Sequence, residues 1–141
     1  MQNLLNEVHT EIVELHDVFV AWFNGSAAKN SLEAELNQRF PKNMLYMEPD
    51  GQIMPQKDLM ALFDANYGSN PEFNIEISDV EIRHQFDDHI LATYTERQTG
   101  SNFSSAKDNV RCTSLLLKKS DPFEWLHIHE TWLPKNAAQS N

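Results

Sequence analysis

The chain carries near its C-terminus the stretch Trp125-Leu-His-Ile-His-Glu-Thr-Trp-Leu133, which alternates in the manner of a strand with one buried face. Alternate side chains of a strand share a face. One face of this strand would carry Leu126, Ile128, Glu130 and Trp132. Glu130 therefore occupies a position where the pattern asks for an apolar residue. Because an unpaired buried charge is costly, this carboxylate indicates a cavity with polar chemistry.

A second predicted strand has the same feature. Its alternating row is Ile90, Ala92, Tyr94 and Glu96, which again ends in a carboxylate. A single inward acid can be an accident of register, whereas two acids on separate strands of one sheet favour a shared pocket. The sequence alone does not identify what fills this pocket.

The N-terminal part of the chain is predicted to be helical. Apolar residues recur there at spacings of three and four, at Leu5, Val8, Ile12, Leu15, Phe19 and Trp22. Asn24-Gly25 ends this helix. Asn30 and Glu33 form the pattern of a capping box for a second helix over residues 30–39. A third helix is predicted from Pro55 to about residue 67, before Gly68.

The remaining segments are predicted to be strands. They span residues 44–48, 52–54, 73–86, 89–98, 107–119 and 124–133. Apolar residues of the 73–86 segment change from odd to even positions at Ser78-Asp79, which predicts a β-bulge that bends a long strand. Helices followed by antiparallel strands predict an α+β fold in which helices cover one face of a curved sheet. We expect a single domain over residues 1–134 and a flexible C-terminal tail over residues 135–141.

Composition restricts the classes of partner. The 141 residues include 21 Asp and Glu against 11 Lys and Arg, a formal net charge of −10. Such a surface repels phosphate backbones, so no nucleic-acid partner is expected. No apolar run approaches the roughly 20 residues of a membrane span, so no membrane association is expected. Cys112 is the single cysteine, which excludes an intrachain disulfide and favours a reducing cytoplasm.

The order of elements resembles the nuclear transport factor 2-like superfamily, which includes SnoaL-like polyketide cyclases, ketosteroid isomerases and the association domain of calcium/calmodulin-dependent kinases. The resemblance covers about residues 3–133. Its local anchors are Phe19-Val-Ala-Trp-Phe-Asn-Gly25, Met47-Glu-Pro-Asp-Gly51 and Trp125-Leu-His-Ile-His-Glu130. It implies a cystatin-like cone, in which a curved antiparallel sheet wraps around a long N-terminal helix and two shorter helices. A deep pocket would lie inside the cone, and the opposite sheet face would form a dimer contact.

Some functional residues of this family have a matching residue in this chain, and others do not. Glu48 matches the carboxylate that ketosteroid isomerases use as general base. Phe19 stands where those enzymes place an acidic hydroxyl, and because phenylalanine cannot donate a hydrogen bond, this departure counts against steroid isomerisation. Relative to the kinase association domain, basic pocket residues are replaced here by Glu96, Ser114 and Glu130. The resemblance therefore implies a pocket suited to cations or hydrogen-bond donors.

The residues expected to line the pocket come from the first helix and several strands. They are Phe19, Trp22, Tyr46, Glu48, Tyr94, Glu96, Cys112, Ser114, Ile128, Glu130 and Trp132, with Glu48, Glu96 and Glu130 as catalytic candidates. Each has a simpler alternative. The inward acids could pair with Arg83, Arg97 or Arg111 or reach solvent, and Glu48 could be a solvated acid beside a turn. The tryptophans could be core residues, and the tyrosines could make buried hydrogen bonds.

The opposite face of the last strand is expected to be a dimer interface. This face would carry Trp125, His127, His129 and Thr131. Two histidines on one face of a strand could begin a metal site, but zinc needs a third or fourth ligand that the sequence does not mark. We therefore expect neither a metal nor a cofactor. His9 and His16 on the first helix are expected to lie at the surface or in hydrogen-bonded packing.

Three functions of different classes remain open. The first is a dimeric small-molecule-binding domain with an acidic, apolar-walled pocket. The second is an acid–base isomerase, cyclase or dehydratase that uses Glu48 or the Glu96/Glu130 pair, since two neighbouring carboxylates share protons unequally. The third is an oligomerisation module with a vestigial cavity, which the absence of an attached catalytic or regulatory domain makes less favoured. We favour the first without assigning a reaction.

Overall fold

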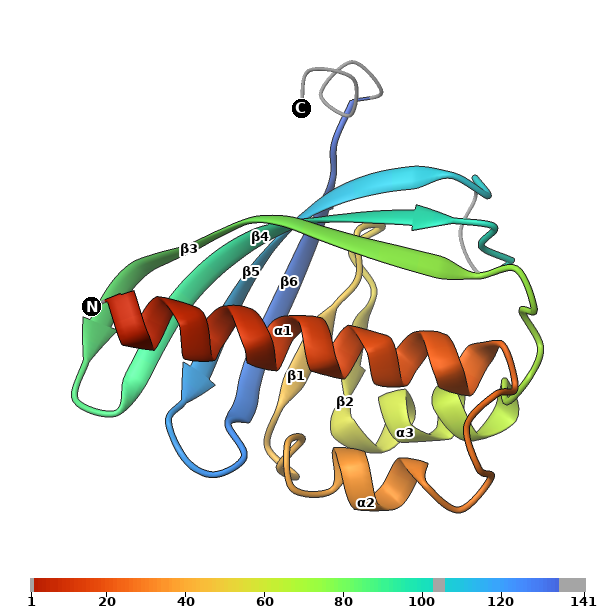
Figure 1. Ribbon diagram of the computed structural model, residues 1–141, viewed down its shortest axis with the longest axis horizontal. Coiled ribbons are helices and arrows are strands. Elements are labelled where there is room, and N and C mark those ends of the chain that lie inside the picture. Colours follow the sequence, from red (N-terminus) through yellow and green to blue (C-terminus); the bar gives the residue numbers. More distant parts are fainter. Residues whose placement is uncertain (1, 103–105, 135–141) are drawn as a thin grey trace.

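A long helix lies across the concave face of a curved sheet in the computed structural model of the chain (Figure 1). The structure describes residues 2–102 and 106–134, so the predicted tail at 135–141 lies outside the described residues. The helices are α1 (Gln2–Phe23), α2 (Leu32–Leu36) and α3 (Gln56–Ala65). The strands are β1 (Leu45–Met47), β2 (Ile53–Pro55), β3 (Asn74–Phe86), β4 (His89–Thr99), β5 (Asn109–Lys118) and β6 (Glu124–Trp132). The predicted α+β class, with its long N-terminal helix and curved sheet, is confirmed.

The six strands form one sheet in the order β2-β1-β6-β5-β4-β3. Neighbouring strands are antiparallel except β1 and β6, which run parallel and join the short β1–β2 hairpin to the long strands. The predicted bulge in β3 is present, because its register with β4 shifts between Ser78 and Glu81, and Asp79 has φ of 54°. A second shift follows between Ile82 and His84. These extra residues bend β3 around α1.

The short second helix departs from its predicted boundaries. Ser31, not Asn30, stands at the N-terminal cap of α2, and it makes no capping hydrogen bond with its side chain. The Ser31 hydroxyl instead donates to the carbonyl of Ala28 at 2.7 Å. The helix then ends at Leu36 rather than near residue 39. The predicted capping box was therefore wrong, because a local turn takes the hydroxyl that would cap the helix.

The ends of α1 and α3 pack closely together. Gly68 donates its backbone N–H to the carbonyl of Trp22 at 3.1 Å. Gly25 has φ of +82°, and a Cβ at this position would lie 3.3 Å from the Cα of Gly68. Glycine suits this crossing for both reasons. The contact fixes the C-terminal half of α1 over α3 and so sets one side of the interior.

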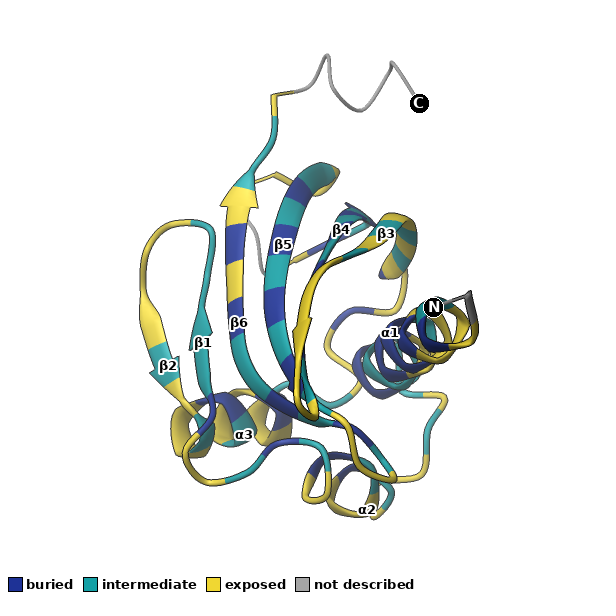
Figure 2. Cartoon of the chain, turned by 90° about the vertical axis from the view of Figure 1, so that its left-hand side faces the viewer, coloured by how far each residue is buried: buried dark blue, intermediate teal, exposed yellow. Residues whose placement is uncertain are grey.

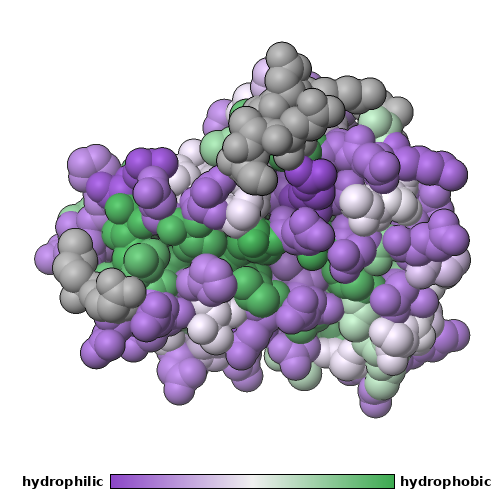
Figure 3. All heavy atoms as spheres, turned by 45° about the horizontal axis from the view of Figure 1, so that its top comes forward, coloured by the Kyte–Doolittle hydropathy of each residue, from purple (hydrophilic) through white to green (hydrophobic). Residues whose placement is uncertain are grey.

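Burial alternates along the central strands β4, β5 and β6, and Figure 2 shows the alternation for β5 and β6. The inner face of the sheet packs against the apolar side of α1, where Val8, Ile12 and Leu15 are fully buried. Leu4, rather than the predicted Leu5, is the buried residue of the first turns. Apolar side chains also gather in a patch between polar margins on the face seen in Figure 3. No helix among the described residues is long and apolar enough to span a bilayer.

Candidate functional site

A cavity of about 170 Å³ lies between α1, α3 and the inner face of the sheet. Its apolar wall consists largely of aromatic rings from α1, α3 and the segments beside them: Phe19, Phe23, Phe40, Phe63 and Phe73. The rings of Phe19 and Phe63 stack with centroids 4.9 Å apart. Such stacked rings form a flat apolar surface. The opposite wall is polar and comes from β1, β4, β5 and β6, together with His16 of α1.

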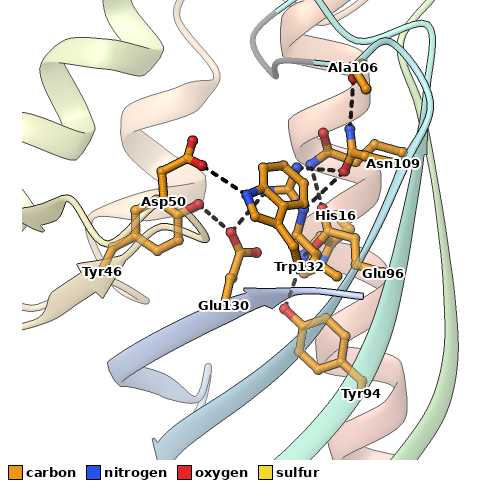
Figure 4. Close-up of polar contacts among 11 residues, drawn as sticks. His16, Tyr46, Asp50, Tyr94, Glu96, Ala106, Asn109, Glu130 and Trp132 are labelled. Carbon is orange, nitrogen blue, oxygen red and sulfur yellow. Dashed lines mark hydrogen bonds and ion pairs between the residues drawn. The ribbon is translucent and has the colours of Figure 1, made fainter. Parts of the chain in front are cut away.

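His16 and Glu96 form one buried pair in this polar wall (Figure 4). The Nε2 atom of His16 lies 3.1 Å from Oε1 of Glu96, and its Nδ1 lies 2.7 Å from the carbonyl oxygen of Ile12. A carbonyl can only accept, so Nδ1 carries a proton. Burial lowers the pKa of His16, but the Glu96 carboxylate and both hydrogen bonds raise it by more. The pair is therefore an imidazolium and a carboxylate.

Arg111 and Glu130 form the second buried pair. Arg111 Nη1 donates to Glu130 Oε1 at 3.0 Å, and both side chains are 6% exposed. The hydroxyl of Tyr46 donates to the same Glu130 oxygen. On its other side Arg111 donates from Nη2 to Asn109 Oδ1 at 2.7 Å. Three neighbouring strands, β4, β5 and β6, thus bring two acids and a guanidinium into one cavity.

The two acids respond differently to burial. Burial raises the pKa of Glu130 to about 7, and the nearby Glu96 carboxylate adds to this rise, although Arg111 and Tyr46 oppose it. Burial acts in the same direction on Glu96, but His16 and Arg111 outweigh it and lower the pKa of Glu96. Neighbouring carboxylates share protons unequally in this way. Glu96 stays ionised, whereas Glu130 exchanges its proton near neutral pH.

The mouth of the cavity lies beside the β1–β2 turn. The indole of Trp132 donates a hydrogen bond to Asp50 Oδ1 at 2.9 Å, and this bond links β6 to the turn (Figure 4). The guanidinium of Arg111 lies over the Trp132 ring, 4.7 Å from its centroid. Glu48 lines the cavity on the same side and is half-buried. The mouth therefore carries two carboxylates and an indole.

Most of the side chains predicted to face inward line this cavity. They are Phe19, Tyr46, Glu48, Tyr94, Glu96, Ile128, Glu130 and Trp132. Trp22 does not line it, because its ring is buried in the core and its Nε1 donates to the carbonyl of Phe63 at 2.7 Å. Cys112 and Ser114 were predicted to face inward and do not. Along β5 the buried positions are Arg111, Thr113, Leu115 and Leu117, which places the residues between them on the outer face.

The outer face of β6 also differs from the prediction at one residue. Trp125 was expected there beside His127, but its side chain is 1% exposed, and its Nε1 donates to Glu11 Oε2 at 2.8 Å. The cause is a register shift, since Leu116 pairs with His127 while Leu117 pairs with Trp125. Leu126 is the extra residue, so Trp125 and Ile128 both point inward. His129 and Thr131 are exposed, as their outer positions require.

His16, Arg111 and Gln98 line the cavity but were not predicted from the sequence to belong to the site. His16 has a recognisable signal, because Ile12, His16, Phe19 and Phe23 form a second helical stripe beside the main apolar face. Arg111 could be found from pairing, since it lies opposite Glu96 in the β4–β5 register. Directly opposed residues of paired strands point to the same face. An inward Glu96 therefore requires an inward Arg111.

Comparison with known proteins gives the fold but no reaction. No protein-family model and no curated protein matches the chain. The structure is similar to an NTF-2-like protein of unknown function from Pseudomonas aeruginosa, at 25% identity and a TM-score of 0.80 over 91% of this chain and 99% of that chain. It is similar to the CaMKII hub of S. rosetta at 13% identity and a TM-score of 0.69, over 91% and 95% of the two chains.

A third similar structure is an uncharacterized protein with a cystatin-like fold from Caulobacter vibrioides, at 16% identity. The TM-score is 0.64, and the match covers 94% of each chain. Together these structures confirm the predicted resemblance to the nuclear transport factor 2-like superfamily and its cystatin-like fold.

Proposed function

We propose that this chain, which has the nuclear transport factor 2-like fold, binds a small molecule in the cavity between α1 and the sheet. The observation that carries the proposal is the division of one cavity into a wall of phenylalanine rings and a wall of buried charged pairs. Burying such pairs is seldom the most stable way to fill a core. An apolar cavity with a few convergent polar groups is typical of a ligand site.

The two walls define the general form of the ligand. A flat apolar body would pack against Phe19 and Phe63, whose rings are stacked. A polar group at one end would reach Glu130 and Arg111 on β6 and β5. The volume of about 170 Å³ suits a ligand of roughly one ring with a short substituent. The acidic pocket lining predicted from the sequence is balanced in part by His16 and Arg111.

A screen by ligand-observed NMR tests this proposal. We expect small aromatic compounds to bind the wild-type protein and to bind the Leu59→Trp variant at least about tenfold more weakly, because the indole would occupy the cavity that Leu59 lines. Leu91→Trp is the matched control, since Leu91 lies on β4 at a position between buried ones. If Leu59→Trp does not fold, Leu62→Trp at the cavity edge replaces it. Equal binding by filled and control variants would count against the proposal.

A second candidate is an acid–base enzyme that uses the same cavity. The observation in its favour is the pKa of Glu130, raised by burial to about 7, because an acid or base works best near the pH of the reaction. Glu96 is less suited to proton transfer, since its pairing with His16 keeps it ionised. For any substrate found, the pH–rate profile of the wild type should show an inflection near neutral pH, and Glu130→Gln should abolish turnover. A normal rate in Glu130→Gln would exclude this carboxylate from the mechanism.

A further inference from the structure

We infer that the ligand is a protonated amine with an apolar body, held through its ammonium group by the carboxylates of Glu130 and Glu48. This inference rests on the proposed binding function and names the chemical class that the same cavity selects. It follows from an account of which hydrogen-bonding groups in the cavity wall already have partners.

Apart from the Tyr94 hydroxyl, whose neighbour is Nε2 of His16 at 3.3 Å, the polar donors of the wall are engaged with the protein itself. Tyr46 donates to Glu130, and Gln98 Nε2 donates to Glu96 Oε2 at 2.7 Å. The Nδ1 proton of His16 goes to the carbonyl of Ile12, and its Nε2 faces Glu96. Arg111 donates to both Glu130 and Asn109. The indole N–H of Trp132 is bonded to Asp50. A ligand that offers only acceptors would have to break one of these bonds or bind at the Tyr94 hydroxyl alone.

Two of the cavity's hydrogen-bond acceptors, in contrast to its donors, have no partner among the described residues. Both Tyr46 and Arg111 bond to Oε1 of Glu130, and Oε2 accepts no hydrogen bond from the residues that the structure describes. The Glu48 carboxylate also has no hydrogen-bond or ion-pair partner within residues 2–102 and 106–134, although it lines the cavity and is half-buried. A carboxylate oxygen can only accept. The complementary ligand is therefore a hydrogen-bond donor.

Charge distinguishes a cationic donor from a neutral one. The cavity lining holds the carboxylates Glu48, Asp50, Glu96 and Glu130 against the cations His16 and Arg111. With every group ionised, acids exceed bases in the cavity, and the whole chain carries a formal net charge of −10. This field favours entry of a cation and opposes entry of an anion. The rings of Tyr46 and Trp132 beside the acids suit an ammonium group as well.

Three compounds of one size separate the alternatives: benzylamine, benzyl alcohol and benzoate. Titration calorimetry should show benzylamine binding at least about tenfold more tightly than benzyl alcohol, because it adds a charge-assisted hydrogen bond. Benzoate should bind most weakly. Glu130→Gln and Glu48→Gln should each weaken benzylamine at least about threefold and leave benzyl alcohol nearly unchanged. Glu81→Gln is the matched control, because Glu81 is 58% exposed on β3.

The pH dependence gives an independent measurement. The titratable and charged groups that line the cavity with Glu130 are His16, Tyr46, Glu48, Asp50, Tyr94, Glu96 and Arg111. An aliphatic ammonium stays charged between about pH 6 and 8. Because the pKa of Glu130 is about 7, benzylamine should bind more tightly as the pH rises through neutrality and should release a proton from Glu130. Benzyl alcohol lacks this preference for the ionised carboxylate.

The outcomes of these experiments distinguish a failure of the inferred amine class from a failure of the proposed binding function. If all three compounds bind equally, or if benzoate binds best, the amine class is overturned while the binding function stands. If benzylamine binds as well to Glu130→Gln and Glu48→Gln as to the control, the assignment of these carboxylates is overturned. If none of the three compounds binds and the wider aromatic screen also finds no difference between cavity-filled and control variants, the proposed function fails with it.

Discussion

Glu130 and Glu96 line the same cavity, yet their partners place them in different protonation states. Glu96 is hydrogen-bonded to the imidazolium of His16, whereas Glu130 shares Arg111 with Asn109 and lies near a second acid. Burial raises the pKa of both acids, and the specific charge partner decides which acid keeps a proton. Proton chemistry at this site therefore depends on single side chains more than on the fold.

Replacement of Glu130 by Gln should change how stability depends on pH. The raised pKa means that the folded protein holds a proton on Glu130 between its ordinary value of 4.5 and about 7, while the unfolded chain has lost it. Stability should therefore fall as the pH rises through this interval. Across the same interval, the free energy of unfolding of Glu130→Gln should rise by at most about 3 kcal/mol relative to that of the wild type. Urea denaturation at several pH values measures this, and parallel profiles would show that Glu130 is not shifted.

Removal of the buried guanidinium of Arg111 should destabilise the protein more than removal of the exposed guanidinium of Arg83. Arg111→Met would leave Glu130 and Glu96 without their shared cation and would remove the contact with Trp132. Because a broken buried pair leaves an uncompensated charge, we expect a loss of about 3–5 kcal/mol in the free energy of unfolding. Arg83→Met is the control, since the Arg83 side chain is 53% exposed, and it should change stability by less than about 1 kcal/mol. Similar losses in both variants would contradict the buried pairing.

At the scale of elements, the alternation of apolar and polar residues predicted where the strands lie better than it predicted which face of the sheet each side chain occupies. The bulge at Ser78-Asp79 was visible because apolar residues change parity there. The bulge at Leu126 left no such sign, since Trp125, Leu126 and Ile128 are all apolar and either parity looks reasonable. In β5 the run Leu115-Leu-Leu117 hides the parity in the same way, so Cys112 and Ser114 were placed inward. Faces of this kind follow only from pairing with a neighbouring strand.

The bulge in β6 can be tested by comparing residues on either side of Leu126. Trp125→Ala should lower the free energy of unfolding by about 3–5 kcal/mol, because it removes a buried ring and leaves Glu11 with one partner fewer. His127→Ala is the neighbouring control and should cost less than about 1 kcal/mol, since His127 is only partly buried. Denaturant unfolding of the two variants provides the measurement. A small loss of unfolding free energy in Trp125→Ala would indicate that Trp125 lies on the outer face after all.

At the scale of the whole molecule, the order of elements specified the fold and the cavity that it encloses. Helices and a short hairpin at the start and four long strands at the end left few arrangements in which each apolar face is covered. The balance of charge inside the cavity was less accessible to sequence. His16 and Arg111 come from α1 and β5, and only the pairing of the strands and the packing of α1 on the sheet bring them together with acids from β4 and β6. Single strands cannot reveal such pairs, because the partners are distant in the chain.

The outer face of the sheet leads to a prediction about assembly. We propose that two copies associate through the outer face of β6, where His127, His129 and Thr131 lie beside the outward residues of β5. Opposed copies would bring like charges together in the His127→Asp, His129→Asp double variant, which should sediment at half the mass of the wild type. The cavity lies on the inner face of the sheet, so the double variant should still bind benzylamine. A wild-type protein that sediments as a monomer, or an unchanged mass in the variant, would exclude this face as the interface.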